Sequence, residues 1–289
     1  MKRCAFLSTN NLEDFYVYDD MVKPFLTRLG WDVQDVSWHD KAVNYDEFDL
    51  IIVRSTWDYQ AHAENFLACL ERINASSARL ENSLDLMRWN LSKCYLRSLH
   101  SKGVPILPSV WHDQFNLEAF KACYTSLQTD ELVIKPLVSA NADYTYRVHF
   151  EQLEDMHEEL ENAFSYRAFM VQAYEHSIEQ VGEYSLFYFD HQFSHAIQKK
   201  PKVGDFRVQE EHGGELFSTA ATKAMRQLAR LVLDALPERA LYARIDMLDT
   251  DRGLEIIEVE LIEPSLYFNM DNASAERFAK VINNKYSKQ

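Results

Sequence analysis

The chain has 289 residues, of which 47% are hydrophobic and 26% are charged, as in an ordinary globular protein with one large lobe or two to three small ones. Its net charge of −15 argues against a general nucleic-acid binder, because no long basic stripe is present to follow a phosphate backbone. Four scattered cysteines without a CxxC pair argue against a zinc knuckle or a disulfide framework, and without a signal sequence or a membrane-length apolar run we expect a soluble cytoplasmic protein that makes no membrane contact.

The first eighty or so residues alternate between strand and helix patterns in the order β-α-β-β-α. We predict strands over 4–8, 31–36 and 49–54, and helices over 19–29 and 64–73. The run DLIIVR is nearly continuous in apolar and β-branched residues, which is typical of a strand in a buried parallel sheet. The chain contains no GxGxxG motif, so the dinucleotide-binding fingerprint is absent.

The segment that follows the last of these strands, RSTWDY, lies at the edge where open α/β sheets bind ligands. Arg54 and Asp58 in this segment have two interpretations. They form an ion pair that ties the loop together, or they contact an acidic or zwitterionic small molecule with Trp57 and Tyr59.

The middle of the chain carries two lysines that are candidates for binding an anion. We predict helices over 90–101 and 150–163, an extended segment over 104–108, and strands over 132–136 and 169–173. Lys135 ends the strand LVIKP, where burying a cation is costly unless an anion compensates it. Lys93 lies in the first of the helices, where an exposed surface lysine is the ordinary interpretation.

A basic segment follows a predicted hairpin. The hairpin has strands over 183–189 and 192–198 around Asp190-His191, and the basic segment covers 199–207 and runs on to Gly213-Gly214. A loop of this length, with cations at one end and glycines at the other, is either a mobile flap over a polyphosphate or a solvated basic loop.

The most informative pattern is an acidic hairpin between helices predicted over 222–236 and 274–282. From Ile257 onward apolar residues alternate with acids, which predicts that Glu258 and Glu260 share one strand face while Ile257, Val259 and Leu261 share the other. The turn sequence DTDRG pairs this strand with 242–248 and brings Asp246 close to both glutamates. Three neighbouring carboxylates form either a magnesium site shared with substrate phosphates or a solvated strand face.

These pieces, in this order, resemble the ATP-grasp superfamily, and within it the branch that holds prokaryotic glutathione synthetase and the D-cycloserine ring-closing ligases. The matching residues are Asn90–Lys93 with Gly103–Pro105, Val133–Pro136, Val171–Tyr174, Gly182–Ser185, Phe193–Ala196, Gly204–Arg207, Gly213-Gly214, Arg244–Asp246 and Glu258–Glu260. The resemblance covers roughly residues 80 to 270, and the segment before it matches only as the expected preceding lobe.

The resemblance implies a mixed fold class, α/β and α+β, with an ATP-grasp fold behind a Rossmann-like pre-ATP-grasp lobe. The implied lobes are 1–82, a central ATP-grasp subdomain over 83–175, and a C-terminal subdomain over 176–289 that carries the metal site. Two departures from the family pattern stand out. Glu260 occupies the place where the family often has asparagine, and the loop 139–143 lacks the family's usual glycines.

The same resemblance implies a role for each matching polar residue. The nucleotide-binding residues are Lys93 and Lys135 at the phosphates, Gln172, Ala173 and Tyr174 at adenine, and Glu183 at the ribose. The metal ligands are Asp246, Glu258 and Glu260, holding one or two Mg²⁺ ions, with Mn²⁺ as an alternative. The catalytic candidates are Arg207, which neutralises the transferring phosphoryl group, and Arg244, which assists it or pairs with an acid.

The implied function is that of an ATP- and Mg²⁺-dependent ligase that joins a carboxylate to an amine, or closes a ring within one molecule, through an acylphosphate. The substrate is a small amino-acid-like molecule, and the products include ADP and phosphate. Glu263-Pro264-Ser265 either faces the acceptor amine or only forms a turn, and His195 is interpreted as a packed histidine rather than a base. A small-molecule kinase, a non-catalytic ATP-binding module and a metal hydrolase are the competing functions, and a homodimer is the default assembly.

Overall fold

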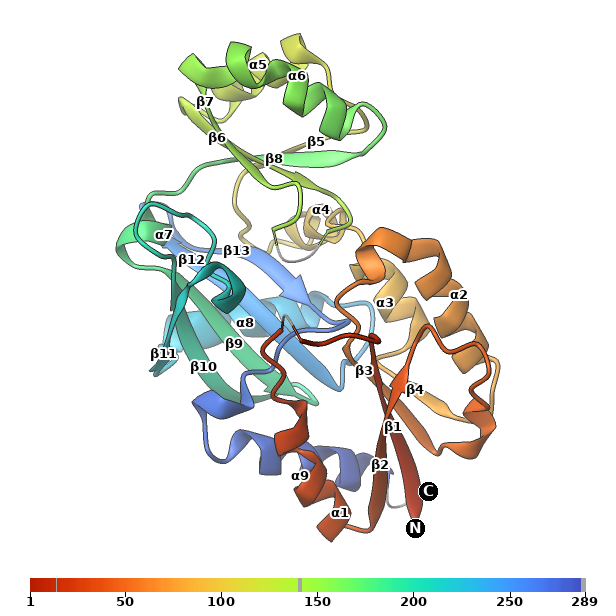
Figure 1. The fold of residues 1–289 in the computed structure, drawn as a ribbon. Coiled ribbons are helices and arrows are strands. Elements are labelled where there is room, and N and C mark those ends of the chain that lie inside the picture. The colour runs from red at the N-terminus through yellow and green to blue at the C-terminus, as the bar shows by residue number, and fades with distance from the viewer. Residues whose placement is uncertain (14, 140–141, 287–289) are drawn as a thin grey trace.

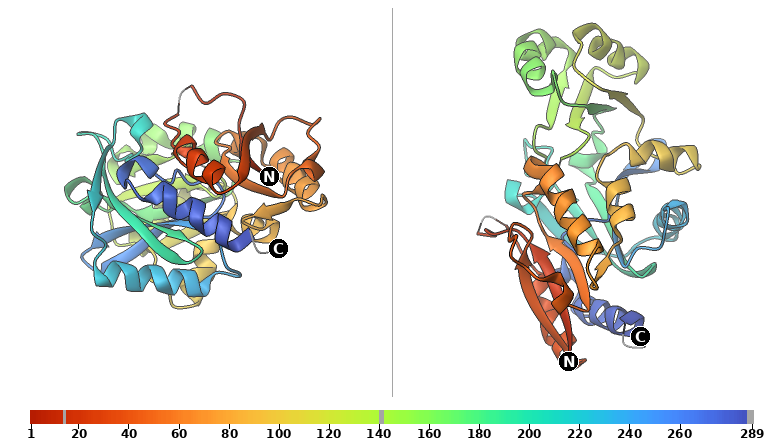
Figure 2. Two further views of the ribbon diagram at one scale, coloured as in Figure 1. Left: turned by 90° about the horizontal axis from the view of Figure 1, so that it is seen from below. Right: turned by 90° about the vertical axis from the view of Figure 1, so that its right-hand side faces the viewer.

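The computed structural model describes residues 1–13, 15–139 and 142–286. It contains three β-sheets, with helices packed on each, distributed along the long axis of the molecule (Figure 1). The sheet formed from the middle of the chain lies at one end, and β1 and α9 lie at the other, as the right-hand view of Figure 2 also shows. None of the helices within the described ranges is long and apolar enough to cross a membrane.

The N-terminal sheet has the order β2-β1-β3-β4 and is parallel throughout. Its elements are β1 (Lys2–Ser8), η1 (Asp19–Met21), α1 (Lys23–Arg28), β2 (Trp31–Ser37), η2 (Tyr45–Glu47), β3 (Leu50–Ser55), η3 (Tyr59–His62), α2 (Ala63–Asn74) and β4 (Arg79–Glu81). The predicted β-α-β-β-α order is confirmed, and β4 is a short addition. The single helix predicted over 19–29 is wrong, because Pro24 lacks an amide hydrogen and fits only in the first turn of a helix that starts at Lys23.

The middle sheet is antiparallel with the order β5-β8-β6-β7. Its elements are β5 (Ser109–His112), α5 (Leu117–Ser126), β6 (Glu131–Pro136), β7 (Tyr146–His149), η4 (Phe150–Gln152), α6 (Leu153–Phe164) and β8 (Phe169–Ala173). The helix predicted over 90–101 is wrong in its first part, since α3 (Leu84–Asn90) ends before α4 (Tyr95–Ser101) begins. The Asn90 amide bonds the backbone of β13 on both sides of residue 260, which anchors the junction and leaves Lys93 in a turn.

The largest sheet has five antiparallel strands in the order β11-β10-β9-β12-β13. Its elements are α7 (Ser177–Gln180), β9 (Glu183–Phe189), β10 (Gln192–Lys200), η5 (Glu210–His212), β11 (Glu215–Thr219), α8 (Lys223–Ala235), β12 (Tyr242–Thr250), β13 (Gly253–Glu260), η6 (Phe268–Met270) and α9 (Ser274–Tyr286). Ala243, Ile245 and Met247 belong to the same buried cluster as the apolar residues of α8. Because side chains alternate along a strand, Arg244 and Asp246 face the opposite side of this sheet.

A β-bulge overturns one part of the predicted alternation. Asp246 pairs with Glu258, but Met247 pairs with Ile256, so Ile257 has no partner in the ladder. Ile256 and Val259 pack in the core beneath the sheet, whereas Ile257 joins a separate apolar cluster on the other face. The prediction that Ile257 shares a face with Val259 is therefore wrong, while Glu258 and Glu260 do lie on one face.

Arg54 and Asp58 do not form an ion pair with each other. The Arg54 guanidinium is buried, lies 2.9 Å from Asp19 and donates a hydrogen bond of 2.8 Å to the carbonyl of Pro264. Asp58 instead accepts hydrogen bonds from Trp38 Nε1 at 2.7 Å and from Thr9, and pairs with His39 at 2.6 Å. The ion-pair interpretation is wrong because Arg54 pairs with Asp19 and Asp58 pairs with His39 instead.

Candidate functional site

Every residue that the sequence assigns to a site lines a single cavity. These residues are Lys93, Lys135, Gln172, Ala173, Tyr174, Glu183, Arg207, Arg244, Asp246, Glu258 and Glu260. They come from the turn before α4, from β6 and β8 of the middle sheet, from β9, β12 and β13 of the large sheet, and from the loop after β10. The N-terminal lobe contributes further lining residues, among them Trp57 and Tyr59. The cavity therefore lies where the three parts of the molecule meet.

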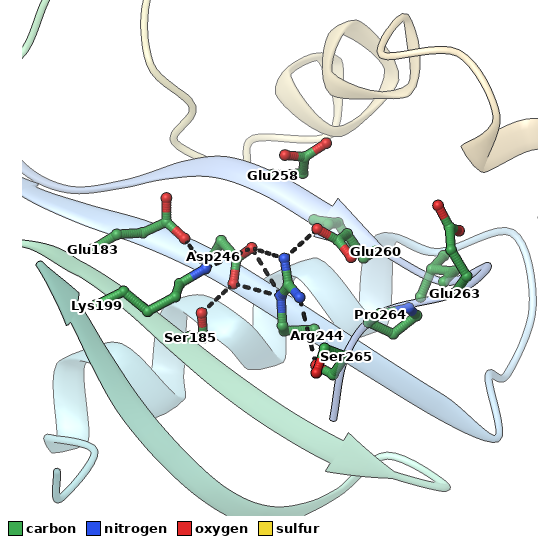
Figure 3. Close-up of polar contacts among 12 residues, drawn as sticks. Glu183, Ser185, Lys199, Arg244, Asp246, Glu258, Glu260, Glu263, Pro264 and Ser265 are labelled. Atoms are coloured by element: carbon green, nitrogen blue, oxygen red, sulfur yellow. Dashed lines mark hydrogen bonds and ion pairs between the residues drawn. The ribbon is translucent and has the colours of Figure 1, made fainter. Parts of the chain in front are cut away.

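Two adjacent strands supply the acidic wall of this cavity. Asp246 of β12 pairs in register with Glu258 of β13, and Arg244 pairs with Glu260 two residues away. Figure 3 shows the side chains of Arg244, Asp246 and Glu260 joined in one network on this face. Of the two interpretations of Arg244, pairing with an acid is seen directly, with its Nε 3.0 Å from an Asp246 oxygen.

The carboxylate of Asp246 is compensated by two cations. It contacts Arg244 Nη2 at 3.0 Å and Lys199 Nζ at 3.7 Å, and it accepts a hydrogen bond of 2.6 Å from the Ser185 hydroxyl. Burial acts to raise the pKa of Asp246, but Arg244 and Lys199 outweigh it and lower that pKa. Lys199 also pairs with Glu183, so Glu183, predicted at the ribose, is held by a lysine in this structure.

The other two acids of this wall also have cationic partners. Glu258 lies 2.6 Å from Lys93 Nζ, and this lysine lowers the pKa of Glu258 although burial acts to raise it. Glu260 contacts Arg244, yet burial, together with Glu258 and Asp246, raises its pKa above the ordinary range. Three carboxylates thus remain close together because three basic side chains stand between them.

A preformed metal centre is not seen in the described part of the chain, where no group of three His, Cys, Asp or Glu side chains is arranged to hold an ion. The donor set of Asp246, Glu258 and Glu260 nevertheless consists only of carboxylate oxygens on a cavity wall, and such oxygens are the ligands that Mg²⁺ prefers. The residues therefore fit a magnesium ion by their chemistry, and their role as metal ligands stays a prediction.

Lys135 differs from the other basic residues of the cavity. It is the last residue but one of β6, lines the cavity, and forms no ion pair with a residue in the described ranges. Burial lowers its pKa, and the nearby Lys93 acts in the same direction while Glu258 opposes both. A cation in this position has unused capacity to bind an anion.

One end of the cavity is apolar. Its lining includes a cluster of Leu107, Val133, Tyr174, Ile178, Val208, Leu248 and Ile257. Tyr174 is fixed in place by Arg147, whose guanidinium lies 3.6 Å from the centre of its ring, and by a hydrogen bond of 2.5 Å to Glu179. The Gln172 side-chain amide donates a hydrogen bond of 2.9 Å to the Ser109 hydroxyl. This bond fixes the orientation of the amide at the edge of the cavity. A flat heterocycle suits a slot with apolar walls and a few polar groups.

The basic segment predicted as a flap divides into two parts. Lys199 and Lys200 belong to β10, and Lys199 is only 3% exposed, so it is a buried residue of the site rather than part of a loop. Arg207 lies in the loop beyond β10 and contacts Asp205 at 2.7 Å. Gly214 must remain glycine, because a Cβ there would lie 2.1 Å from the carbonyl oxygen of Val208.

Lys199 is a residue of the candidate site that the sequence does not single out. Counting outward from the Asp190-His191 turn pairs Glu183 with Gln198, and a bulge between Phe193 and His195 shifts the register so that Lys199 pairs with Glu183 instead. His195, by contrast, is packed as expected, stacked 4.2 Å from Phe187 with its Nε2 3.1 Å from the carbonyl of Leu266.

Comparison with known proteins finds relatives of similar sequence and fold. Residues 4–82 match the family described as the N-terminal domain of D-cycloserine synthetase DcsG. The cycloserine biosynthesis protein DcsG of Streptomyces lavendulae is 28% identical over 269 residues, covering 88% of this chain and 89% of the relative. The crystal structure of D-cycloserine synthetase DcsG superposes with a TM-score of 0.88 at 24% identity, covering 98% of this chain and 99% of that one.

A more distant solved structure shares the fold. It is the ATP-grasp ligase PsnB in complex with a phosphomimetic precursor variant, Mg and ADP, with a TM-score of 0.67 at 12% identity over 99% of each chain. The chain has the ATP-grasp fold. Its sequence is similar to that of the cycloserine biosynthesis protein DcsG over most of both chains, and this similarity supports an ATP-dependent ligase. The predicted ATP-grasp fold is confirmed.

Proposed function

We propose that this ATP-grasp protein is a Mg²⁺-dependent ligase that forms a carbon–nitrogen bond between a carboxylate and an amine of small amino-acid-like substrates, through an acylphosphate. The observation that carries the proposal is the single cavity in which an apolar slot, uncompensated Lys135 and the acidic wall of β12 and β13 lie together. The proposal also includes a division of the chain into three lobes, over residues 1–82, 83–175 and 176–289.

We expect the orientation of the nucleotide to match the distribution of apolar and charged residues in the cavity. Adenine occupies the apolar slot beside Tyr174, and the polyphosphate extends toward Lys135 and Lys93. Lys135 forms no ion pair with a described residue. A phosphate group that binds to it therefore displaces no ionic partner. Asp246, Glu258 and Glu260 would hold magnesium, which supplies charge neutralisation for the phosphates.

The reaction itself requires positioning and charge neutralisation rather than covalent help from the protein. A substrate carboxylate oxygen attacks the γ-phosphorus, the bond to ADP breaks, and an acylphosphate forms. The amine nitrogen then attacks the acyl carbon, the bond to phosphate breaks, and the amine loses a proton. Arg207 stabilises the negative charge on the transferring phosphoryl group once it leaves Asp205, and Arg244 holds Asp246 and Glu260 in place.

A panel of amino acids and dipeptides incubated with Mg-ATP tests this function. We expect stoichiometric release of ADP and phosphate with at least one amine–carboxylate combination, and a product whose mass corresponds to loss of water between the two groups. A phosphoester product would identify a kinase instead. Release of phosphate that does not depend on an amine would also contradict the proposal.

The relationship to D-cycloserine synthetase favours ring closure within one molecule as the first substrate class for this panel. Compounds that carry a carboxylate and an aminooxy or amino group on one short chain belong in the panel beside pairs of separate amino acids. Product mass distinguishes the two outcomes.

A further inference from the structure

The segment Glu263-Pro264-Ser265, which follows β13, is held by side chains at three successive carbonyl oxygens. Trp57 Nε1 donates to Glu263 at 2.8 Å, and Arg54 Nη2 donates to Pro264 at 2.8 Å. Arg244 Nη1 donates to Ser265 at 3.4 Å. Two of these donors come from the end of β3 and its following loop, and the third comes from the acidic wall. The backbone is therefore fixed at the place where the N-terminal lobe meets the cavity.

The side chain of Glu263 is buried beside this fixed backbone without an ionic partner among the described residues. Glu263 is 8% exposed and lines the cavity, yet in the parts of the chain that the structure covers no Lys, Arg or His forms an ion pair with it. Burial raises its pKa to about 7, although a hydrogen bond with Tyr59 and the charge of Lys93 act to lower it. Figure 3 draws its carboxylate apart from the network that joins Arg244 to Asp246 and Glu260.

Three aromatic residues of the N-terminal lobe line the cavity together with Glu263. Tyr59 hydrogen-bonds the Glu263 side chain, Trp57 donates to the Glu263 backbone carbonyl, and Phe15 lies against Trp57 with ring centres 5.2 Å apart. All three rings line the same cavity as Glu263. A carboxylate beside aromatic faces attracts an organic cation by charge and by cation–π interaction, and the rings keep competing water away.

We propose that Glu263, with Trp57, Tyr59 and Phe15, forms a subsite for a primary ammonium group of the substrate. The inference rests on the proposed ligase function and specifies one chemical feature of its substrate. A buried carboxylate without a counter-ion is costly, and an arriving ammonium group supplies that counter-ion. The substrate is accordingly a compact molecule with both a carboxylate, which is activated near Lys135 and Arg207, and an amine held at Glu263.

The three acids of β12 and β13 provide the contrast that assigns this subsite. Asp246, Glu258 and Glu260 each have a basic partner within the protein, so an ammonium group there would have to displace it. At Glu263 an ammonium group would displace no basic residue of the described chain. Its weak contact with Gln60, at 3.5 Å, is neutral and leaves the carboxylate available.

The test compares two ligands that differ only in the amine. Alanine of either hand and lactate of either hand are titrated by calorimetry into the full-length protein saturated with Mg-ADP. We expect the better alanine enantiomer to bind at least about tenfold more tightly than lactate, as for loss of one charged hydrogen bond. In Glu263→Gln, which keeps the size and hydrogen-bonding capacity, we expect this preference to disappear. Equal binding of alanine and lactate to the wild-type protein would overturn the subsite.

A matched control separates the effect of Glu263 from the loss of any negative charge in the cavity. Glu211 of η5 is an exposed acid that also lines the cavity, and Glu211→Gln should retain the alanine preference. If Glu263→Gln also retains it, the carboxylate is structural and the proposal is wrong. Mg-ATP affinity is measured on all three proteins. Failure of Mg-ATP to bind the wild type would refute the proposed function, whereas intact Mg-ATP binding without amine preference refutes only the subsite.

Discussion

The acidic wall and the Glu263 end of the same cavity handle buried charge in opposite ways. On the wall, Asp246, Glu258 and Glu260 are each compensated by an arginine or a lysine of the protein. Glu263, by contrast, forms no ion pair with a described residue, and neither does Lys135 of the same cavity. Since isolated buried charge is costly, the uncompensated groups indicate where charged parts of a ligand bind.

Asp58 shows that a buried or half-buried acid in this protein is not by itself a sign of function. It accepts from Trp38 and Thr9 and pairs with His39, which satisfies both oxygens. Asp58 lies outside the lining of the cavity although it follows Trp57 directly. Asp58 and Glu263 therefore differ in that Asp58 pairs with His39, whereas Glu263 has no ionic partner among the described residues.

The largest effect is expected from removing a shared partner on the compensated wall. Arg244→Met leaves Asp246 and Glu260 without their guanidinium, and losing one member of a buried ion pair costs about 3–5 kcal/mol of unfolding free energy. Urea denaturation of the ligand-free protein measures this. Arg230→Met, which breaks an exposed pair with Asp234 on α8, should change stability by less than about 1 kcal/mol. Equal effects of the two variants would contradict the distinction.

The uncompensated acid is expected to make stability depend on pH. The pKa of Glu263 is raised from 4.5 to about 7 in the folded state, so between these values the folded protein keeps a proton that the unfolded chain releases. Stability is lost as pH rises through this window, by about 3 kcal/mol for the full shift. Glu263→Gln lacks this contribution. Stability curves of wild type and variant that stay parallel from pH 4.5 to 8 would refute the raised pKa.

Removal of the uncompensated cation is expected to affect catalysis strongly. Lys135→Met should lower the rate of ADP formation by about a hundredfold, the scale for losing one transition-state contact, and Arg207→Ala and Glu258→Gln should do the same. Lys121→Met, on the exposed face of α5, serves as the control and should leave the rate unchanged. Undiminished turnover in Lys135→Met would remove this lysine from the phosphate site.

The same variant should have the smallest effect on folding. Because Lys135 has no ionic partner in the described part of the protein, replacing it with methionine leaves no buried charge behind. We expect the unfolding free energy of ligand-free Lys135→Met to equal that of the wild type within about 1 kcal/mol, or to exceed it. A loss as large as that of Arg244→Met would show that Lys135 has a structural partner.

Much of this fold was predictable because its strands have clear local patterns. The runs at 169–173 and 183–189 were predicted to the residue, and the acidic hairpin pairs as its turn sequence indicates. The ordered motifs identified residues that the structure brings to one cavity from three parts of the chain. These signals are short-range, so a sequence carries them directly.

The predictions that proved wrong concern features set by tertiary contacts. The bulge at Ile257, the partner of Arg54 and the turn at Lys93 each depend on a residue far away in the chain. Pairing register, ion-pair choice and helix ends of this kind follow from tertiary contacts, which local patterns do not determine. That no described residue forms an ion pair with Glu263 is likewise visible only in the folded structure.

Calorimetric titration of Mg-ATP into the wild-type protein and into Lys135→Met tests the central claim most directly. The account predicts binding at one site in the wild type and a loss of affinity of at least about tenfold in the variant, since a charged contact to phosphate is removed. No heat of binding in the wild type, or identical affinities in both proteins, would contradict it.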